Sequence, residues 1–389
     1  MVSSRFQRFL LPGFAFKAVV IGGGYATGRE LAEYFLGSGP AGGALGMLVS
    51  MLCWSVLCAA TFLFAHVTGS RDFGSFFRHL LGRAAFLFDI VYACFLLIVL
   101  SVFGAAAGEL GHSIFNWPAW IGTVLLVTSI AVVVTYGNQS VEALFRYVTY
   151  FLYAVYVSLF ILSMFKFGRP IEHAFATVPP SGNWWLGGMT YAGYNAIGAV
   201  AILPVLRHLR SRRDAVVAGV LAGALGMLPA LLFFICMSAF YPQIAAATLP
   251  SDYLLQRLDA PVFHLFFQCM IFAALLESGA GIVHGANERI ATVLGSRGVV
   301  LSRAGRLAVG SVLLITSVWI AAQFGLVALV ARGYRFLALM MLVVYVVPVL
   351  TLGLWRATRR VLVIDKGSLV PGTLPGGSIT SAPGDGGAE

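Results

Sequence analysis

The sequence predicts an all-helical integral membrane protein with about ten transmembrane helices. Of its 389 residues, 59% are hydrophobic and only 10% are charged, whereas a soluble domain carries about 25% charged residues. Apolar runs of about 20 residues recur along the chain, and a run of that length crosses a bilayer as a helix. Composition and spacing therefore favour a multi-span membrane protein over a soluble domain.

The apolar runs define ten spans in chain order. The first five cover residues 11–36, 41–66, 84–108, 119–136 and 145–167. The second five cover residues 184–207, 214–240, 260–289, 304–322 and 333–355. The first is a retained span, since it continues past Lys17 into a glycine cluster and lacks a small-residue cleavage site. Residues 361–389 are rich in Gly, Pro, Ser and Thr, and we expect them to form a disordered cytoplasmic tail.

Basic residues and tryptophans predict the orientation. With a cytoplasmic N-terminus, most of the 25 Lys and Arg residues, Lys17 among them, fall on the inner side, as the positive-inside rule requires. Trp117, Trp120, Trp184 and Trp185 then lie at outer boundaries. The net charge of +10 is explained by this topology and not by a nucleic acid partner. We expect a multi-pass protein of the cytoplasmic membrane with both termini in the cytoplasm.

The ten spans also divide into two similar halves. The starts of the last five spans follow those of the first five at a nearly constant distance in sequence. Because five is an odd number, the second half enters the membrane from the opposite side. The sequence therefore predicts a five-plus-five inverted repeat, with residues 1–167 as the first unit and 168–360 as the second.

The first span is interrupted near its middle. Gly22, Gly23 and Gly24 are consecutive, Gly28 follows, and Arg29 comes directly after it. Glycine in a helix interior costs roughly 1 kcal/mol relative to alanine, and a charge inside the bilayer costs more. The pattern predicts a helix that unwinds at mid-membrane and offers its backbone to a solute.

The sixth span, which is the partner of the first, is interrupted as well. It contains Gly187, Gly188, Gly193 and Gly198, and Pro204 follows. Two interrupted spans at matching positions of two halves indicate a binding site at the membrane midplane. The alternative is that these glycines only allow helices to pack closely.

This arrangement resembles the amino acid–polyamine–organocation superfamily, which has the LeuT-like fold with broken first and sixth helices. Two motifs, Gly-Gly-Gly-Tyr-Ala-Thr-Gly-Arg-Glu-Leu from Gly22 and Glu-Ser-Gly-Ala-Gly-Ile-Val-His-Gly-Ala-Asn-Glu-Arg from Glu277, resemble the YkvI-type bacterial membrane proteins. That resemblance covers essentially the whole chain short of the tail and implies fold more than substrate. The Asn-Phe-x-Arg-Phe-Pro continuation of sodium symporters is missing after the glycines, which argues against sodium coupling.

The first interruption supplies one wall of the predicted solute site. Its substrate-binding candidates are Gly22, Gly23, Gly24, Tyr25 and Thr27. We expect an outer half-helix to begin near Tyr25, where free N–H groups suit a carboxylate. The carbonyl groups freed just before it suit a cation.

The sixth span supplies the opposite wall through Tyr191, Gly193, Tyr194 and Asn195. The Asn195 amide offers one acceptor and two donors, and a tyrosine could cover the solute like a lid. The alternative is that the tyrosines pack in the core with satisfied hydroxyl groups.

Glu277, in the eighth span, is the predicted ion-coupling residue. An intramembrane carboxylate is a functional candidate by default, and it could carry a proton or bind a cation. Ser278 and the carbonyl group of Val20 would complete a cation site. A structural hydrogen bond from Glu277 to another helix is the alternative.

Arg29 and Glu30 are predicted gate residues, because they lie just outward of the first interruption. Arg29 could close the outer vestibule by pairing with a carboxylate of another helix. The alternative is a local pair between Arg29 and Glu33 at i,i+4.

His284 and Glu288 follow Glu277 on one face of the eighth span. No second His or Cys accompanies them at ligand spacing, so we predict no metal site. An inner-end cluster balanced by Arg289 is the favoured interpretation of this pair.

These features favour a secondary active transporter that moves a small polar solute, an amino acid or a related amine or carboxylate, by alternating access. H⁺ or Na⁺ would be the coupling ion, and no other cofactor is expected. A passive channel or facilitator is the alternative, and the residues for an enzyme or an ATP-driven pump are missing. The predicted partners are the solute and the lipid bilayer, and the oligomeric state stays open.

Overall fold

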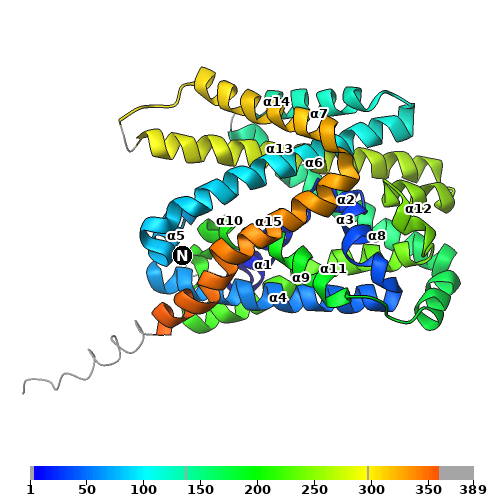
Figure 1. Cartoon of the computed structure of the whole chain (residues 1–389), viewed down its shortest axis with the longest axis horizontal. Helices are drawn as coiled ribbons and strands as arrows, with labels where there is room; N and C mark the ends of the chain where they lie inside the picture. Colours follow the sequence, from blue (N-terminus) through cyan, green and yellow to red (C-terminus); the bar gives the residue numbers. More distant parts are fainter. Residues whose placement is uncertain (1–3, 136–137, 296–297, 359–389) are drawn as a thin grey trace, which may run out of the picture.

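The structure is a computed structural model that describes residues 4–135, 138–295 and 298–358, and within these ranges its regular elements are all helical (Figure 1). The first half of the chain forms η1 (Phe6–Leu10), α1 (Leu11–Val20), α2 (Gly23–Ala26), α3 (Arg29–Tyr34), η2 (Leu36–Ser38), α4 (Gly39–Thr68), α5 (Phe73–Leu81), η3 (Gly82–Ala85), α6 (Phe86–Phe115), α7 (Ala119–Thr135) and α8 (Asn138–Thr177). The second half forms α9 (Trp184–Tyr194), α10 (Ile197–Ala201), η4 (Leu203–His208), α11 (Arg212–Ser238), η5 (Gln243–Ala246), α12 (Pro250–Leu258), α13 (Pro261–Gly295), α14 (Arg303–Ala328), η6 (Leu329–Gly333), α15 (Tyr334–Met341), η7 (Leu342–Val346) and η8 (Val349–Gly353).

Each predicted span falls on one or more of these helices, but the described residues contain only six helical stretches long and apolar enough to cross a membrane. The first and sixth spans are split into short helices, and the fourth, Ala119–Thr135, is a shorter apolar helix. The ninth and tenth form one stretch, Arg303–Thr358. No loop separates them, because Gly325 turns the chain inside α14 with φ 69° and ψ 170°, a conformation that only glycine adopts readily.

One predicted boundary falls inside a helix. The division between residues 167 and 168 lies inside α8, which continues through Gly168 and Pro170 to Thr177. The tail predicted for residues 361–389 lies outside the described residues.

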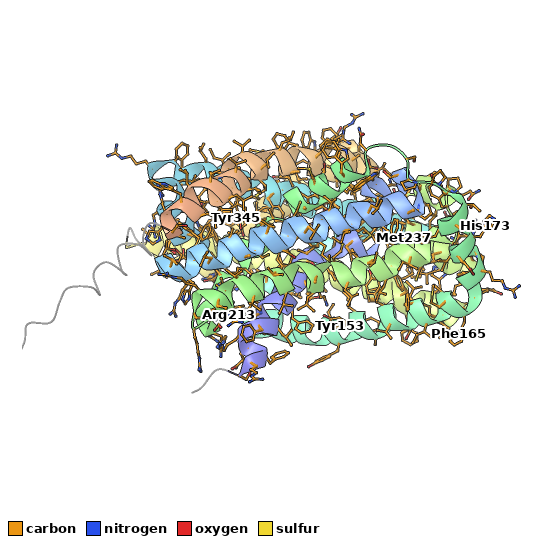
Figure 2. The ribbon with its side chains drawn as sticks, turned by 90° about the horizontal axis from the view of Figure 1, so that it is seen from below. Tyr153, Phe165, His173, Arg213, Met237 and Tyr345 are labelled. Atoms are coloured by element: carbon orange, nitrogen blue, oxygen red, sulfur yellow. The ribbon has the colours of Figure 1, made fainter. Side chains whose placement is uncertain are left out.

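The side chains on the outside of the bundle are largely apolar. Phe165 on α8 is 88% exposed and points away from the helices in Figure 2. Trp319 on α14 and Val343 in η7 are also more than half exposed. A soluble monomer rarely exposes so much contiguous apolar surface, so this belt is suited to the hydrocarbon of a bilayer.

Helices α4 and α11 pack against each other along most of their length and lie side by side in both views (Figures 1 and 2). Small residues make the contact close: a Cβ atom at Gly219 would overlap the backbone of Ala59, and one at Gly223 would overlap Ser55. Such small-residue seams bring helix backbones together where packing drives association in lipid. The pair forms the floor on which the short helices α1 and α9 lie.

We expect Gly219→Ala to destabilise the protein, because the added methyl group meets the α4 backbone and the helices must move apart. Overpacking of this kind costs roughly 1–3 kcal/mol. Gly168→Ala is the matched control, since no atom lies within 4 Å of a Cβ atom at that helical position. Thermal unfolding in detergent should show a lower midpoint for the first variant only, and equal midpoints would contradict this account of the seam.

Candidate functional site

The backbone of the first span leaves the helix at Ile21. Helix α1 ends at Val20, Ile21 has φ −78° and ψ 76°, and the Gly22 N–H donates to the Val20 carbonyl at 2.9 Å. These values describe an inverse γ-turn. The Val20 carbonyl, predicted to bind a cation, therefore already accepts one hydrogen bond and keeps one lone pair for another.

The outer half of the first span differs from its prediction. In place of one helix beginning near Tyr25, the chain forms the four-residue α2 and the six-residue α3, separated at Gly28. Gly28 has φ 76°, a left-handed conformation that favours glycine. Two such short segments align few peptide dipoles, so the N-terminal charge expected to attract a carboxylate is weakened.

The sixth span changes conformation more gently. Helix α9 ends at Tyr194, and the following turns use bonds to the third preceding residue, such as Ala196 N–H to Gly193 O. The Asn195 amide, a predicted solute ligand, donates to the carbonyl of Tyr191 at 3.1 Å. Part of its hydrogen-bonding capacity therefore satisfies its own helix.

The glycines of the sixth span pack against neighbouring helices. A Cβ atom at Gly187 would overlap the Tyr34 carbonyl, and one at Gly188 would overlap the Gly46 carbonyl. At Gly193, a predicted solute-binding residue, a Cβ atom would lie 3.1 Å from the Cβ atom of Ala338. The packing interpretation thus accounts for these glycines, while Gly22 has more room, with Ser278 Oγ 3.7 Å from an ideal Cβ atom.

Glu30, a predicted gate residue, is buried in the protein core. Glu30 is 4% exposed, and its carboxylate accepts a hydrogen bond from the Tyr194 hydroxyl at 2.5 Å. Within the described part of the chain, Glu30 has no ion-pair partner within 4 Å. The predicted gate residue and the predicted solute-binding tyrosine therefore meet in one buried contact.

Six tyrosines surround this carboxylate, and we call them the tyrosine cluster. All lie within electrostatic range of Glu30 and are 8% exposed or less. They come from five elements, α2, α3, α8, α9 and α15: Tyr25, Tyr34, Tyr156, Tyr191, Tyr194 and Tyr334.

Ring contacts join the tyrosine cluster in two groups, Tyr25 with Tyr156 and the other four with one another. The Tyr194 ring stacks on Tyr334 with centroids 4.3 Å apart and contacts Tyr191 edge-on at 5.6 Å. The Tyr25 ring lies 5.6 Å from Tyr156. Tyr156 and Tyr334 were not predicted from the sequence, since a tyrosine in an apolar run carries no signal of what it will face.

Three hydroxyl groups of the cluster have no hydrogen-bond partner among the described residues: those of Tyr25, Tyr156 and Tyr191. The Tyr34 hydroxyl, in contrast, donates to the Val330 carbonyl at 2.6 Å. Buried hydroxyl groups are nearly always hydrogen-bonded to protein or water. Polar atoms left without a protein partner beside a carboxylate indicate a place prepared for water or a solute.

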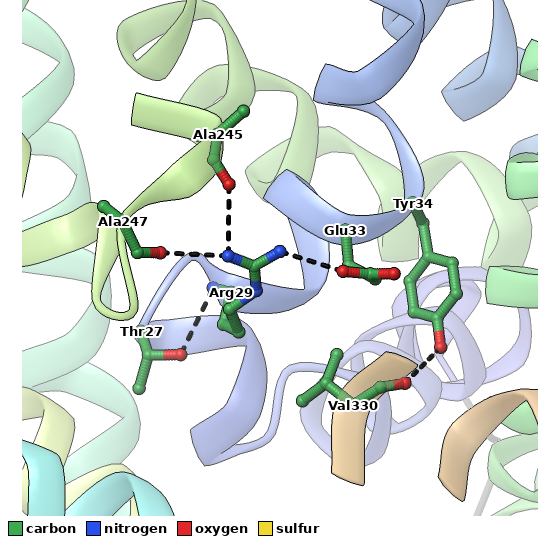
Figure 3. A network of polar contacts seen from close by, with 7 residues as sticks. All are labelled: Thr27, Arg29, Glu33, Tyr34, Ala245, Ala247 and Val330. Atoms are coloured by element: carbon green, nitrogen blue, oxygen red, sulfur yellow. Dashed lines mark hydrogen bonds and ion pairs between the residues drawn. The ribbon is translucent and has the colours of Figure 1, made fainter. Parts of the chain in front are cut away.

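Arg29, at the start of α3, contacts Glu33 and the loop that contains Ala245 and Ala247 (Figure 3). It pairs with Glu33 at 2.9 Å and donates to the carbonyls of Ala245 and Ala247 at 3.1 and 2.9 Å. The local pair with Glu33 thus forms, and in addition Arg29 fastens the segment between α11 and α12. The gate role of Arg29 stays a prediction, and its partners on another segment are carbonyl groups and not a carboxylate.

The same loop is tied to the first interruption through Thr27. The Thr27 hydroxyl accepts from the Arg29 N–H at 3.3 Å, and its carbonyl accepts from the Ser251 N–H at 3.0 Å. Thr27 is fully buried. Through these bonds Thr27, a predicted solute ligand, joins the start of α3 to α12.

Lys17, predicted to lie on the cytoplasmic side, is buried inside the bundle. It is 4% exposed, and its Nζ atom lies 3.4 Å from the centre of the Tyr153 ring on α8. Glu277 on α13 lies within its electrostatic range. The hydropathy pattern did not predict the burial of Lys17, because a single lysine near the start of an apolar run is indistinguishable from a charge that flanks a span.

Glu277 is partly buried and has no hydrogen bond or ion pair within 4 Å in the described ranges. Its neighbour Ser278 faces Gly22 at the first interruption. Lys17, Glu277, Ser278 and the γ-turn carbonyl of Val20 are thus supplied by α1 and α13, while the tyrosine cluster comes from other helices. We call Lys17 and Glu277 the lysine–glutamate pair.

The charged residues near the C-terminal end of α13 form ion pairs with residues of other helices. Glu288 pairs with Arg306 on α14, and Arg289 pairs with Asp89 on α6 at 2.7 Å. His284 is half-buried between them and Glu277. Within the described ranges no group of three or more His, Cys, Asp and Glu residues is placed to hold a metal ion.

Asp252 anchors α12 to α13 at the end of the bundle near Arg29. Its carboxylate contacts His264 Nε2 at 2.7 Å and accepts from the amides of Gln268 and Gln256 at 2.7 and 2.8 Å. Burial alone would raise the pKa of Asp252, but the hydrogen bonds from His264, Ser113 and Gln256 hold it below its ordinary value. The ionised carboxylate is therefore the form that secures α12.

Comparisons with known proteins agree with this architecture. No protein-family model matches the chain. It is homologous to the membrane protein YkvI of Bacillus subtilis strain 168, with 25% identity over 289 residues, 72% of this chain and 80% of YkvI. The resemblance stated from the two motifs is confirmed.

Solved structures of LeuT-fold proteins superpose on most of the chain. MhsT in complex with L-phenylalanine matches with a TM-score of 0.60 and 14% identity, covering 92% of this chain and 98% of MhsT. A manganese transporter of Eremococcus coleocola matches at 0.54 with 16% identity and coverages of 94% and 86%. Mhp1, a nucleobase-cation-symport-1 family transporter with bromovinylhydantoin bound, matches at 0.51 with 15% identity and coverages of 86% and 74%. At these identities the likeness shows the fold: the chain is a multi-pass membrane protein with a LeuT-like fold.

Replacing Arg29 by Lys should loosen the loop, because a lysine ammonium cannot reproduce the planar fork that joins Glu33 to two carbonyls. Amide hydrogen exchange across residues 243–252 should become faster. Arg332→Lys, at an exposed arginine, should leave it unchanged. Unaltered exchange in the Arg29 variant would show that other contacts hold the loop.

The Asp252 network should make stability depend on pH. A carboxyl whose pKa is lowered in the folded state stabilises it above the unfolded pKa of about 3.9, and this contribution is lost as pH falls through the folded pKa. Asp252→Asn should therefore lower the midpoint of thermal unfolding at neutral pH and lose less on acidification than the wild type does. Asp259→Asn, at an exposed neighbouring site with φ 54° that asparagine tolerates, is the control and should follow the wild type.

Proposed function

We propose that the protein is a secondary active transporter that moves a small polar solute across the cytoplasmic membrane by alternating access. The observation that carries the proposal is the non-helical turn at Ile21 and Gly22, which lies between two groups of buried ionisable side chains. Irregular backbone at membrane depth is tolerated where it lines a site or is buried in protein. The fold is shared with transporters of manganese and of the nucleobase-cation-symport-1 family.

A five-plus-five inverted repeat with discontinuous first and sixth helices is part of this proposal. The packing supports it, because α1 lies on α11 as α9 lies on α4. If α1 and α4 correspond to α9 and α11, these two contacts are equivalent, and α4 and α11 meet at the axis between the halves. With the N-terminus and the C-terminus in the cytoplasm, the loop held by Arg29 faces outward.

We infer that the solute binds between the first interruption and α9. Gly22, Gly23, Gly24 and Tyr25 would form one wall, and Tyr191, Gly193, Tyr194 and Asn195 the other. Thr27 would support the first wall through its bonds to Arg29 and Ser251. The buried hydroxyl groups of Tyr25 and Tyr191, which have no protein partner among the described residues, support this location.

Coupling to H⁺ is favoured over Na⁺ by the lysine–glutamate pair. A sodium ion at Glu277, Ser278 and the Val20 carbonyl would lie close to the Lys17 ammonium, which already places one positive charge there. Protonation of Glu277 would remove its attraction for Lys17, and deprotonation would restore it. Such a switch at the end of α1 offers a direct route from proton binding to helix movement.

Two latches at opposite ends of the bundle favour alternating access over an open channel. At one end Arg29 fastens the loop before α12. At the other, the Arg8 guanidinium binds both oxygens of Asp214 at the start of α11, at 2.9 and 2.7 Å. A passive facilitator remains the second candidate, and solute flux that does not saturate with concentration would favour it.

The coupling role can be tested by Glu277→Gln in proteoliposomes. After a screen of isotopically labelled amino acids and amines has identified a transported compound, its uptake driven by a pH gradient should be lost in the variant. Exchange of the same compound without a gradient should persist, since the solute site is intact.

Glu288→Gln is the matched control, because Glu288 lies on the same helix but is exposed and paired with Arg306. It should keep gradient-driven uptake. A Glu277 variant that retains both uptake and its pH dependence would contradict the coupling role, and uptake that requires Na⁺ would contradict proton coupling.

A further inference from the structure

The tyrosine cluster and Glu30 have a chemistry that selects among solutes. We propose that they recognise a cationic amine, so that the transported compound carries an ammonium group bound by the Glu30 carboxylate. This inference rests on the proposed transport function and deepens it by naming the substrate class.

Charge is the first argument. Glu30 is 4% exposed, receives one hydrogen bond from Tyr194, and has no basic side chain within ion-pair distance in the described residues. Its neighbour in sequence, Arg29, is engaged by Glu33 and by two carbonyl groups. A buried ionised carboxylate without a counter-charge is costly, and a cationic solute would supply that charge.

Hydrogen-bonding capacity is the second argument. An ammonium group has three N–H donors and no acceptor. Around Glu30 the free groups are the carboxylate lone pairs, which only accept, and the hydroxyl groups of Tyr25, Tyr156 and Tyr191, which can accept as well as donate and have no partner in the described residues. The aromatic rings of the cluster add cation–π attraction for the same group. The acceptors around Glu30 are thus complementary to the three N–H donors of an ammonium group.

A carboxylate headgroup is disfavoured by the same geometry. It would meet the Glu30 charge as a like charge, and the nearest helical segments, α2 and α3, are too short to offer a strong positive helix end. The amino group of an amino acid or the headgroup of an amine therefore fits beside Glu30, while an acid without a nitrogen does not.

Matched compounds test this selection in the purified wild-type protein. Each of three sets consists of an amino acid, its decarboxylated amine and its deaminated acid: leucine, isoamylamine and 4-methylpentanoate; phenylalanine, phenethylamine and 3-phenylpropionate; alanine, ethylamine and propionate. Binding stabilises the folded state, so at least one ammonium-bearing compound should raise the midpoint of thermal unfolding, and the deaminated acid of that set should not.

Variants then locate the binding. Glu30→Gln should weaken binding of the ammonium compound by about 10- to 100-fold, because a charge-assisted hydrogen bond is lost. Tyr191→Phe, which removes only a hydroxyl group, should weaken it by a smaller factor. Glu172→Gln, at an exposed site on α8, should leave it unchanged.

The outcomes separate this inference from the transport proposal. If the acids bind as well as the amines, or if Glu30→Gln binds normally, the amine inference is wrong while transport can stand. Absence of binding by every ammonium compound also overturns the inference. Failure of the transport proposal would instead appear as absence of saturable flux for every compound that binds.

Discussion

The structure depends on one constraint: a polar group buried in a membrane must find its partner inside the protein. The constraint is most severe at Ile21 and Gly22, where the first span leaves the helix. There the Gly22 N–H is satisfied by the Val20 carbonyl in an inverse γ-turn, and the Ser278 side chain faces Gly22. Two acidic residues and one lysine, Glu30, Glu277 and Lys17, are also buried or partly buried in the bundle, where neither lipid nor an apolar core could accommodate an unpartnered charge.

The turn separates these charges into two groups of different chemistry. On one side, Glu30 lies among tyrosines whose hydroxyl groups are only partly used. On the other, Glu277 lies within reach of Lys17, so the protein itself contains both signs of charge. The first arrangement lacks a cation and the second already has one. This difference is why we assign solute recognition to the first group and coupling to the second.

Glycine serves two separate purposes in this fold. At Gly28 and Gly325 it allows a positive φ, which divides the outer half of the first span and turns α14 without a loop. At Gly187, Gly188 and Gly219 it allows backbones to approach, which seats α9 on α4 and joins α4 to α11. The two purposes look alike in a sequence, since both appear as glycines in an apolar run, yet only the first changes the course of the chain.

The sequence alone determined the membrane character, the approximate positions of the apolar helical segments and the departure from helix at Gly22, because hydropathy and glycine clustering are local properties of the chain. It also identified Glu30, Tyr191, Tyr194 and Glu277 as residues of interest from their depth in apolar runs. Only the tertiary structure decided which of them meet: Glu30 with Tyr194, Tyr156 and Tyr334 beside them, and Lys17 with Glu277. These partners lie far apart in sequence on separate helices, and helix packing, which no local pattern encodes, brings them together around the broken backbone.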